Sequence, residues 1–445
     1  MAFSRRETAI LLMGDFLILV ASLWVALLLR NLELPSFGYL QENFWPFLPM
    51  FFLSLGVFYV SGLYEKQTRP IRSVMGIRIF GAQIATVVIS AILFFTLPFP
   101  IAPQTILILY LIVSVAAESS WRFYWMNREI KEGRRIPALL IGSGAAVLEL
   151  YDEVYKNDRY LIRFVEHVET KNLAGKSVAD TISSNVMAGI RTIIIDMSDP
   201  KVVHDLLPLY NLMADGVSFL GFSSLYEEIF DRVPLQHLAA NELLGSLQRR
   251  YTFYDLAKRI FDIALALIGI SIALPFVGVA AALLLVGGGM PFVMNERIGR
   301  GGRTFHIIKL RSMLFNDHGN PELQKENRVT AFGRFLRKSR IDELPQLWNV
   351  LVGDLSFIGP RPELPKIAEV YDREIPQYRI RHLIAPGLSG WAQIHDYDAP
   401  RGPADVVRTN RKVSYDLYYL KRRSFGLDLA IAIKTLRTLF AFSGT

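Results

Sequence analysis

Two adjacent carboxylates, Asp342 and Glu343, lie just before Pro345. Three basic residues precede the pair closely: Arg337, Lys338 and Arg340. Because proline is tolerated in the first turn of a helix, the spacing predicts a helix that starts near Asp342. The positive end of a helix dipole favours the ionised carboxylate. An ionised aspartate in this position can attack phosphorus as a nucleophile or bind Mg²⁺.

The sequence leaves a second role for Asp342 open, because an aspartate before a helix most often caps its N-terminus. Four apolar residues at helical spacing then predict one buried face: Leu344, Leu347, Trp348 and Leu351. Gly353 is the predicted end of this helix. Further on, Arg361 lies between two prolines, which restrict its backbone and suit either an anion clamp or a simple turn.

A second group of candidate phosphate ligands precedes the carboxylates. Residues 293–313 are predicted to form two short strands around a glycine-rich turn. Alternation along the second strand would place four residues on one face: Phe305, Ile307, Lys309 and Arg311. A lysine and an arginine two residues apart make a cationic site suited to phosphate, although such a pattern is more often a solvated face.

The chain that must position these residues is apolar and basic. It has 445 residues, of which 51% are hydrophobic and 20% charged, with a mean hydropathy of +0.29 and a formal net charge of +8. This composition excludes a disordered or simple soluble chain and favours a membrane protein with anionic partners. The absence of cysteine excludes disulfides, thiolate metal sites and cysteine nucleophiles.

Four apolar segments near the N-terminus are predicted to cross a bilayer: residues 8–29, 44–63, 74–97 and 105–117. Basic residues gather before the first segment, between the second and third, and after the fourth: Arg5, Arg6, Lys66, Arg69, Arg72, Arg78, Arg122, Arg128, Lys131, Arg134 and Arg135. The positive-inside rule then predicts that everything after residue 122 is cytoplasmic. Asp15 and Glu118 lie near span ends, and we expect them to reach the interface or pair locally.

Residues 136–225 alternate predicted strands and helices, including one helix over 202–213, which indicates a small parallel α/β domain. Gly142 and Gly144 match the start of a dinucleotide-binding fingerprint, but Val147 stands where its third glycine belongs. We therefore expect this turn to be structural.

A further apolar stretch, residues 261–289, contains Pro275 and is flanked by basic residues on both sides. A crossing would leave one basic flank outside, whereas a helix bent at Pro275 can enter and leave by the same face. We expect such a re-entrant helix, with Ser271 satisfying part of the freed backbone and an ordinary fifth span as the alternative. The stretch 426–440 is predicted to lie on the membrane interface or to pack against the preceding domain.

Residues 252–445 resemble the bacterial sugar transferases, which are monotopic polyprenyl-phosphate hexose-1-phosphate transferases. The resemblance rests on blocks in the same order: Lys258-Arg-Ile-Phe-Asp262, the helix with Pro275, Glu296-Arg-Ile-Gly, Phe305-His-Ile-Ile-Lys-Leu-Arg-Ser-Met313, Ile341-Asp-Glu-Leu-Pro-Gln346, Gly353-Asp-Leu-Ser-Phe-Ile-Gly-Pro-Arg-Pro-Glu363 and Pro386-Gly-Leu-Ser-Gly-Trp-Ala-Gln393. The preceding part resembles the long form of the family, whose α/β domain looks like a CoA-binding fold.

The resemblance implies a four-span α-helical membrane bundle (1–130), a small α/β Rossmann-like domain with its linker (131–250), and an α/β monotopic catalytic domain (251–445) with a re-entrant membrane helix at about 258–289. It also implies the bacterial inner membrane as the location, with the catalytic domain on the cytoplasmic face, and it suggests a homodimer. No nucleic-acid partner is expected.

The resemblance implies that a UDP-sugar gives its sugar-1-phosphate to undecaprenyl or another polyprenyl phosphate and releases UMP, which starts a capsule, O-antigen or exopolysaccharide. By this likeness Asp342 becomes a covalent phosphosugar ester and binds Mg²⁺, and Glu343 assists the second step. The expected phosphate and donor ligands are Lys309, Arg311, Arg337 and Arg361. A catalytically silent scaffold and a Mg²⁺-dependent nucleotide-sugar hydrolase remain the alternatives.

The chain departs from the family pattern at two positions. Leu274 stands before Pro275 where the family commonly has serine, so the bend must depend on the proline. Ala385 stands before the Pro-Gly turn where a basic residue is common, and Arg381 or His382 could replace that charge. Neither departure affects the Asp-Glu pair.

Overall fold

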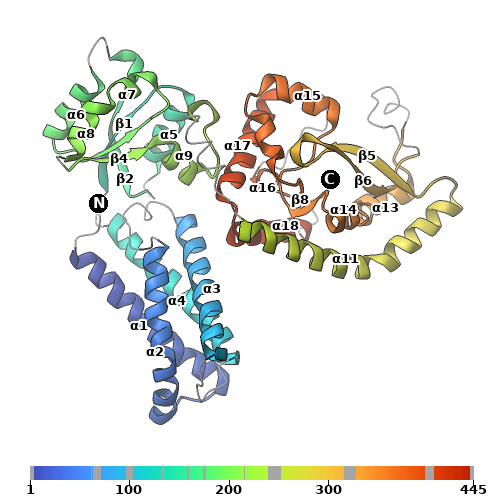
Figure 1. The fold of residues 1–445 in the computed structure, drawn as a ribbon, viewed down its shortest axis with the longest axis horizontal. Coiled ribbons are helices and arrows are strands. Elements are labelled where there is room, and N and C mark those ends of the chain that lie inside the picture. Colours follow the sequence, from blue (N-terminus) through green and yellow to red (C-terminus); the bar gives the residue numbers. More distant parts are fainter. Residues whose placement is uncertain are drawn as a thin grey trace. The chain divides into compact units, whose positions relative to one another are not determined.

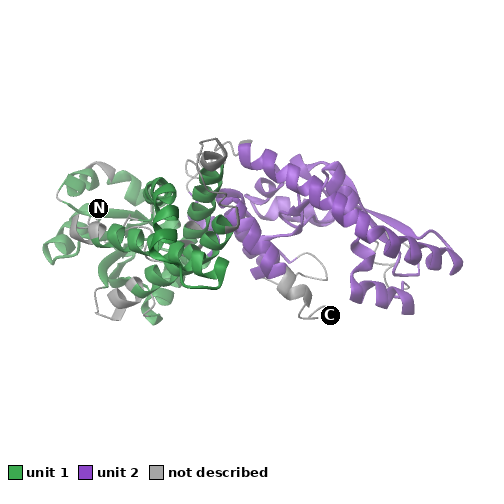
Figure 2. Cartoon of the chain, turned by 90° about the horizontal axis from the view of Figure 1, so that it is seen from below, with its two compact units in different colours: residues 1–230 green, residues 231–445 purple. Residues whose placement is uncertain are grey.

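The computed structural model describes residues 5–61, 63, 72–96, 104–131, 135–157, 160–173, 177–214, 216–238, 252–314, 327–395 and 405–440. The chain forms two compact units, residues 1–230 and 231–445 (Figure 2). Lys66 and Arg69 of the basic loop, Arg134, and most of the predicted linker before residue 251 lie outside the described residues. The division into three domains at residues 130 and 250 stays a prediction.

The first unit begins with four long helices (Figure 1): α1 (Arg5–Asn31), α2 (Phe37–Val60), α3 (Arg72–Thr96) and α4 (Gln104–Lys131). Among the described residues, α1 over Ile10–Asn31 and α4 over Ile106–Tyr124 are apolar and long enough to cross a membrane. The apolar part of α3 is shorter, at Ile79–Ala91. Two spans are thus supported in this unit, and four spans stay a prediction.

The charged residues near the predicted span ends are buried inside the four helices. Asp15 on α1 is 0% exposed and forms an ion pair with Arg122 on α4. The Arg122 guanidinium also donates to the carbonyl of Leu63, 3.0 Å away. Glu118 is 0% exposed as well, one turn from Arg122 on α4. Local pairing, one of the two expected outcomes, is therefore confirmed for Asp15, and Glu118 is buried beside this pair.

A small parallel sheet follows, as predicted. Its order is β2-β1-β3-β4, with β1 (Ile136–Ile141), β2 (Ile162–Val168), β3 (Thr192–Ile195) and β4 (Ser218–Gly221). Five helices accompany it: α5 (Ala145–Lys156), α6 (Val178–Met187), α7 (Pro200–His204), α8 (Leu206–Ala214) and α9 (Phe222–Phe230). Separate apolar clusters cover the two faces of β1, which explains its continuous apolar sequence.

The predicted single helix over 202–213 is wrong, because two helices, α7 and α8, occupy this stretch. The residue between them, Asp205, turns its carboxylate to the start of α6. It accepts from the Ser177 hydroxyl and from the backbone N–H of Val178, both at 2.7 Å. Capping a neighbouring helix fixes Asp205 in a conformation that separates α7 from α8.

The turn after β1 is closed by its own hydrogen bonds. The Ser143 hydroxyl lies 2.7 Å from the Thr170 hydroxyl, which in turn donates to the Asp199 carboxylate. The Lys201 ammonium donates to the backbone carbonyl of Thr170 at 2.8 Å. This is the position at the carboxyl ends of the strands where doubly wound sheets bind ligands, but its side chains pair with one another.

The second unit combines short strands with helices. An antiparallel pair, β5 (Phe292–Ile298) and β6 (Thr304–Leu310), confirms the predicted strands around the glycine-rich turn η4 (Arg300–Gly302). A parallel pair is formed by β7 (Ser356–Ile358) and β8 (Gly387–Ser389). The other elements are η3 (Leu235–His237), α11 (Thr252–Val286), α13 (Ala331–Ser339), η5 (Ile341–Glu343), α14 (Gln346–Val352), α15 (Pro365–Glu374), η6 (Tyr378–Leu383), α16 (Trp391–His395), α17 (Val406–Arg422) and α18 (Phe425–Phe440).

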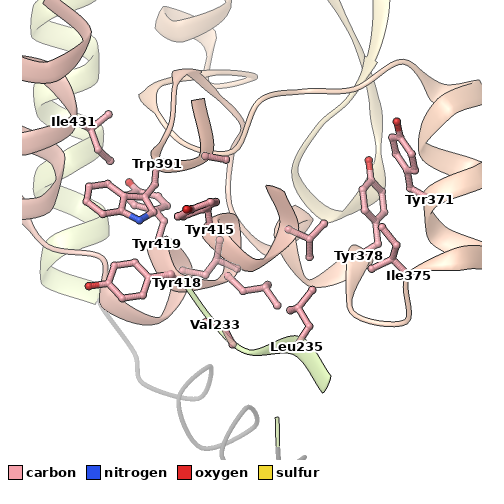
Figure 3. Packing of buried hydrophobic residues seen from close by; sticks show 14 of the residues in the cluster. Val233, Leu235, Tyr371, Ile375, Tyr378, Trp391, Tyr415, Tyr418, Tyr419 and Ile431 are labelled. Carbon is pink, nitrogen blue, oxygen red and sulfur yellow. The ribbon is translucent and has the colours of Figure 1, made fainter. Parts of the chain in front are cut away.

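An aromatic core holds α16 and α17 together with the segment before α11 (Figure 3). The rings of Trp391 and Tyr418 stack with their centroids 5.7 Å apart. Val233 and Leu235 pack against the same cluster. The second unit therefore begins at Asp231, well before residue 251, where its start was predicted.

Helix α11 is one continuous, curved helix with Pro275 inside it, and its concave side faces α13 and α14 (Figure 1). It is apolar and long enough to cross a membrane over Phe253–Val286. The Ser271 hydroxyl donates to the carbonyl of Leu267 at 2.9 Å, so it does not bond the carbonyl that Pro275 leaves free. A break into two helices is not observed, and the helix continues through Pro275.

One face of α11 packs against the second unit along its whole length. Ala266 lies in a core with Phe305 and Val350, while Leu284 lies in another with Leu310 and Leu336. The opposite face is exposed and apolar, with large side chains on it: Ile260, Leu265, Ile268, Ile272, Leu274, Phe276, Val279 and Leu283. Both ends of α11 therefore lie on the same body of protein, and its free surface is apolar.

Candidate active site

Asp342 lies in the short 3₁₀ turn η5, and α14 begins only at Gln346. The helix predicted to start near Asp342 thus begins as a 3₁₀ turn, and the α-helix itself starts after Pro345, which occupies its cap position; the Asp342 side chain caps neither element. Arg340 precedes the turn in the left-handed conformation, at φ 56°. This conformation is costly for a residue with a side chain, by roughly 1–3 kcal/mol, and it reverses the chain between α13 and the carboxylate pair.

Helix α14 ends at Gly353 as predicted, with φ 101° at that glycine. Its buried face differs from the prediction, since Trp348 is 54% exposed. Asn349 takes the buried position, and its side-chain amide bonds the backbone of β6. The amide donates to the His306 carbonyl at 2.8 Å and accepts from the Ile308 N–H at 3.1 Å. This amide fixes the strand that carries Lys309 against the helix that follows Asp342.

No role was predicted for Asn349 from the sequence. A polar residue among buried apolar neighbours is the signal that could have identified it, because a buried amide must find partners. The helix is also held at its other end, where Arg259 of α11 donates to the carbonyls of Val350 and Leu351, both at 2.7 Å.

The structure brings Lys309 and Arg337 to the carboxylate pair. The Lys309 ammonium lies 2.8 Å from Glu343 Oε1. The Nε of Arg337 donates to the Ser312 hydroxyl at 2.8 Å, which anchors this arginine beside the end of β6. Both cations act electrostatically on Asp342. The two predicted phosphate ligands therefore flank one site.

The two carboxylates differ in their protonation behaviour. Asp342 is only 8% exposed, and burial together with the neighbouring Glu343 raises its pKa to about 6, against the opposing effect of Lys309 and Arg337. Burial also raises the pKa of Glu343, but Lys309, Arg361 and Arg340 outweigh it and bring that pKa below its usual range. At pH 7 both groups are predominantly ionised, and Asp342 is the more basic of the two.

Arg361 is exposed and acts electrostatically on Glu343 from the turn after β7. Its backbone carbonyl accepts a hydrogen bond from Arg381 at 2.9 Å. Arg381 is itself 1% exposed at its side chain and pairs with Asp416 at 2.7 Å. A buried ion pair thus fixes the backbone of the Pro-Arg-Pro turn, which agrees with the restricted arginine predicted from sequence.

Arg311 lies outside this group of cations. Strand β6 ends at Leu310, so the alternation that placed Arg311 beside Lys309 does not continue. Its guanidinium donates to the carbonyl of Leu284 at 3.2 Å and also to the carbonyl of Gly288, at the end of α11. In the structure Arg311 caps that helix, where a cation is favoured by the helix dipole.

The donor set at the turn fits Mg²⁺. The described residues contain no cluster of three or more acidic or histidine side chains that could hold a metal alone. Mg²⁺ does not require one, since it commonly binds one or two carboxylates together with substrate phosphates. The buried Asp342 beside Glu343 offers two such carboxylates, and a cation there would counter both the burial and the repulsion from Glu343 that raise the pKa of Asp342.

A buried aspartate beside a half-buried glutamate, among cations and on a body with an exposed apolar helix, suits the class of proteins that bind phosphates beside a membrane. Residues 253–442 match the family model of the bacterial sugar transferases. The chain is 43% identical over 223 residues to UDP-N-acetylgalactosamine-undecaprenyl-phosphate N-acetylgalactosaminephosphotransferase of Aeromonas hydrophila, which covers 49% of this chain and 51% of the relative.

Two further relatives are UDP-glucose:undecaprenyl-phosphate glucose-1-phosphate transferases. The Caulobacter vibrioides protein is 37% identical over 190 residues, covering 42% of this chain and 70% of the relative. The Escherichia coli K12 protein is 35% identical over 244 residues, covering 53% of this chain and 50% of the relative. The matches thus span about half the length of the Aeromonas and Escherichia proteins. The chain belongs to the bacterial sugar transferase family.

Proposed function

We propose that the chain transfers a sugar-1-phosphate from a UDP-sugar to a polyprenyl phosphate, with UMP as the leaving group. The observation that carries this proposal is the carboxylate pair Asp342 and Glu343 among Lys309, Arg337 and Arg361, on the same body as the apolar face of α11. The names of the relatives support the two substrate classes. The sugar itself and the polysaccharide that it starts are not assigned.

In the first step a carboxylate oxygen of Asp342 attacks the phosphorus that bears the sugar. A bond forms between that oxygen and phosphorus, and the bond from phosphorus to the UMP oxygen breaks. In the second step an oxygen of the polyprenyl phosphate attacks the same phosphorus and releases Asp342. Two displacements suit a soluble donor and a lipid acceptor that reach one site from different phases.

The surrounding residues have separate roles in this scheme. Arg337 and Arg361 bind the charged phosphate oxygens and stabilise the charge that develops there. Glu343, kept ionised by Lys309, can accept a proton from the incoming lipid phosphate. A bound Mg²⁺ would be held by Asp342 and Glu343 and would neutralise charge on the diphosphate.

The membrane helix α11 would place this site at the bilayer surface. Its packed face holds both of its ends against the second unit, so a crossing would require the catalytic unit on both sides of the bilayer. We propose that α11 enters and leaves by one face, with the apolar side chains around Pro275 in the lipid. The basic loops of the first unit favour the cytoplasmic face of the inner membrane, where the helices of that unit would be anchored.

The test is UMP release by the purified full-length protein in detergent, over a panel of UDP-sugars with Mg²⁺. Each donor is assayed with and without undecaprenyl phosphate, beside Asp342→Asn. Release that needs the lipid, one sugar and Asp342 supports the transferase. Lipid-independent release beyond one equivalent indicates a hydrolase, and no release from any donor indicates a catalytically silent scaffold.

A further inference from the structure

Two arginines connect α11 to the segments that carry the candidate active site, and the reaction proposed above uses neither of them. Near the start of α11, the Arg259 guanidinium donates to the carbonyls of Val350 and Leu351 in the last turn of α14, both at 2.7 Å. Just beyond the other end of α11, the Arg311 guanidinium donates to the carbonyl of Gly288. Cations suit both places, because the last carbonyls of a helix carry partial negative charge.

Each guanidinium lies against a glycine in the left-handed conformation. Gly353 has φ 101°, and a Cβ on it would lie 3.2 Å from Nη2 of Arg259. Gly289 has φ 94°, and a Cβ on it would overlap with Nη1 of Arg311. Glycine meets both requirements, because it adopts a positive φ readily and has no side chain in the way. The backbone is therefore shaped to receive both arginines.

A third side chain joins these bonds into a closed ring. The Asn349 amide of α14 donates to the backbone of β6 and also accepts from it. Strand β6 leads directly into Arg311, which bonds the end of α11. The ring therefore runs from α11 through Arg259 to α14, through Asn349 to β6, and through Arg311 back to α11.

The residues of the candidate active site lie within this ring. Lys309 lies on β6, between the strand residues that Asn349 bonds and Arg311. Asp342 and Glu343 lie in η5, shortly before α14. The ion pair of 2.8 Å between Lys309 Nζ and Glu343 Oε1 therefore joins two segments of the ring. Its geometry depends on how β6 and α14 are held.

The middle of α11 lies against the same turn. Ile341, at the start of η5, packs in one apolar cluster with Val277. Leu347 of α14 lies so close to Gly269 that a Cβ on this glycine would be 3.1 Å from Cδ1 of the leucine. The carboxylates are thus held beside the part of α11 that contains Pro275. A shift of this helix would move them relative to β6.

We propose that Arg259 and Arg311 are positioning residues for the proposed reaction. By closing the ring near the two ends of α11, they fix the distance between Lys309 and the carboxylate pair. This inference rests on the proposed function and gives α11 a second role, because the helix then maintains the geometry of the site as well as contacting the bilayer. Small changes should be measurable, since a misplacement of about 1 Å can cost roughly 10²-fold in rate.

A double-mutant cycle on the full-length protein in detergent tests the ring, with kcat for UMP release as the readout. Arg259→Met and Arg311→Met should each lower kcat about 10- to 100-fold. The KM for the UDP-sugar should stay within about threefold of the wild type, because Arg337 and Arg361 are unchanged. Since either substitution opens the same ring, the double variant should fall within about threefold of the worse single variant.

The cycle has its own control. The two arginines bond positions roughly 38 Å apart along α11, and independent sites at such a distance would multiply their losses. Arg300→Met replaces an exposed arginine of the turn between β5 and β6, and its effect should simply multiply with that of Arg259→Met. Thermal unfolding checks that every variant is folded. If a methionine variant does not fold, Arg259→Lys and Arg311→Lys, which keep a cation, should show the same coupling with smaller losses.

Two neighbouring glycines offer a matched pair of changes that leaves the charge of Arg311 intact. Gly288 and Gly289 have φ 83° and 94°, so substitution by alanine strains the backbone similarly at both. Only a Cβ at position 289 would meet the guanidinium, whereas a Cβ at position 288 has nothing within 4 Å. Gly289→Ala should therefore lower kcat as Arg311→Met does, and Gly288→Ala should stay within about threefold of the wild type.

Hydrogen–deuterium exchange tests the ring without turnover. Arg311→Met should raise the exchange of the α14 backbone, although the bonds of Arg311 are to the end of α11. Exchange that rises only around the end of α11, or losses of kcat that multiply in the double variant, would overturn the proposal. If Arg311→Met raises the exchange of α14 but the wild type releases no UMP from any donor, the ring stands and the proposed reaction fails.

Discussion

The turn after β1 and the turn before α14 are both polar, but they differ in where their hydrogen bonds and charges go. Around Ser143, the hydroxyls and the carboxylate of Asp199 pair with one another and leave little for a ligand. Around Asp342, a buried carboxylate has a raised pKa, and within the described residues the exposed guanidinium groups of Arg340 and Arg361 donate no hydrogen bond to the protein. Polar groups that are satisfied within the protein stabilise its fold, whereas groups left uncompensated are the ones that point to function.

The largest expected effect separates these two turns directly. Asp342→Asn should reduce UMP release by about 10³-fold or more, because the amide cannot form the phosphosugar ester. Asp199→Asn, the matched change in the first unit, should leave release within about twofold of the wild type, since its carboxylate only accepts hydrogen bonds inside the turn. Assays of both variants under identical conditions test the difference. Equal losses of UMP release in the two variants would contradict the different roles of the two turns.

The second effect concerns a buried ion pair inside the second unit. Asp416 is buried and pairs with the fully buried Arg381, so Asp416→Asn should leave an uncompensated charge and destabilise the protein by about 3–5 kcal/mol. Thermal unfolding followed by tyrosine and tryptophan fluorescence measures this change. A matched exposed pair, Arg379 and Asp372, provides the control, and Asp372→Asn should have a far smaller effect. Stability unchanged in Asp416→Asn would show that the ion pair does not hold the turn.

The third effect is on the pH dependence. The pKa of Asp342 is raised to about 6, so the carboxylate holds its proton up to that pH and cannot attack below it. The value of kcat/KM for the donor should fall about tenfold per pH unit below pH 6. Because Lys309 lowers the pKa of Asp342, Lys309→Met should move this limb to higher pH. If the acid limb stays at the same pH in Lys309→Met, the group that titrates in this limb is not Asp342.

The smallest effect is expected in the first unit. Ser143→Ala removes one hydroxyl from the chain of hydrogen bonds to Thr170 and Asp199, which should cost about 0.5–1.5 kcal/mol of stability. UMP release should be unaffected. Thermal unfolding and the release assay together check both statements, and a loss of activity without a loss of stability would indicate that this turn has a functional role.

Motifs with local physical causes were predictable from the sequence. Gly353 ends α14 because the chain needs a left-handed residue there, and β5 and β6 follow the alternation around their glycine-rich turn. The parallel sheet follows from buried apolar strands between helices. These features depend on neighbours in the sequence, so a local pattern is enough.

Features that depend on distant partners were not predictable. Trp348 is exposed because Asn349 takes the buried position to bond β6, a strand some 40 residues earlier. Arg311 does not lie on the same face as Lys309, because its guanidinium donates to a backbone carbonyl near the end of α11. Lys412 is brought to Glu363 only by the fold, and nothing in the local sequence of either residue marks them as a pair.

Intact-protein mass spectrometry tests most directly whether Asp342 attacks phosphorus and becomes a covalent phosphosugar ester. The full-length protein is incubated with its UDP-sugar and Mg²⁺ but without polyprenyl phosphate. We predict a mass gain equal to one sugar-1-phosphate less one water, lost on addition of the lipid phosphate and absent in Asp342→Asn. Active protein that shows no mass gain, and that releases UMP only when the lipid is present, would contradict the account.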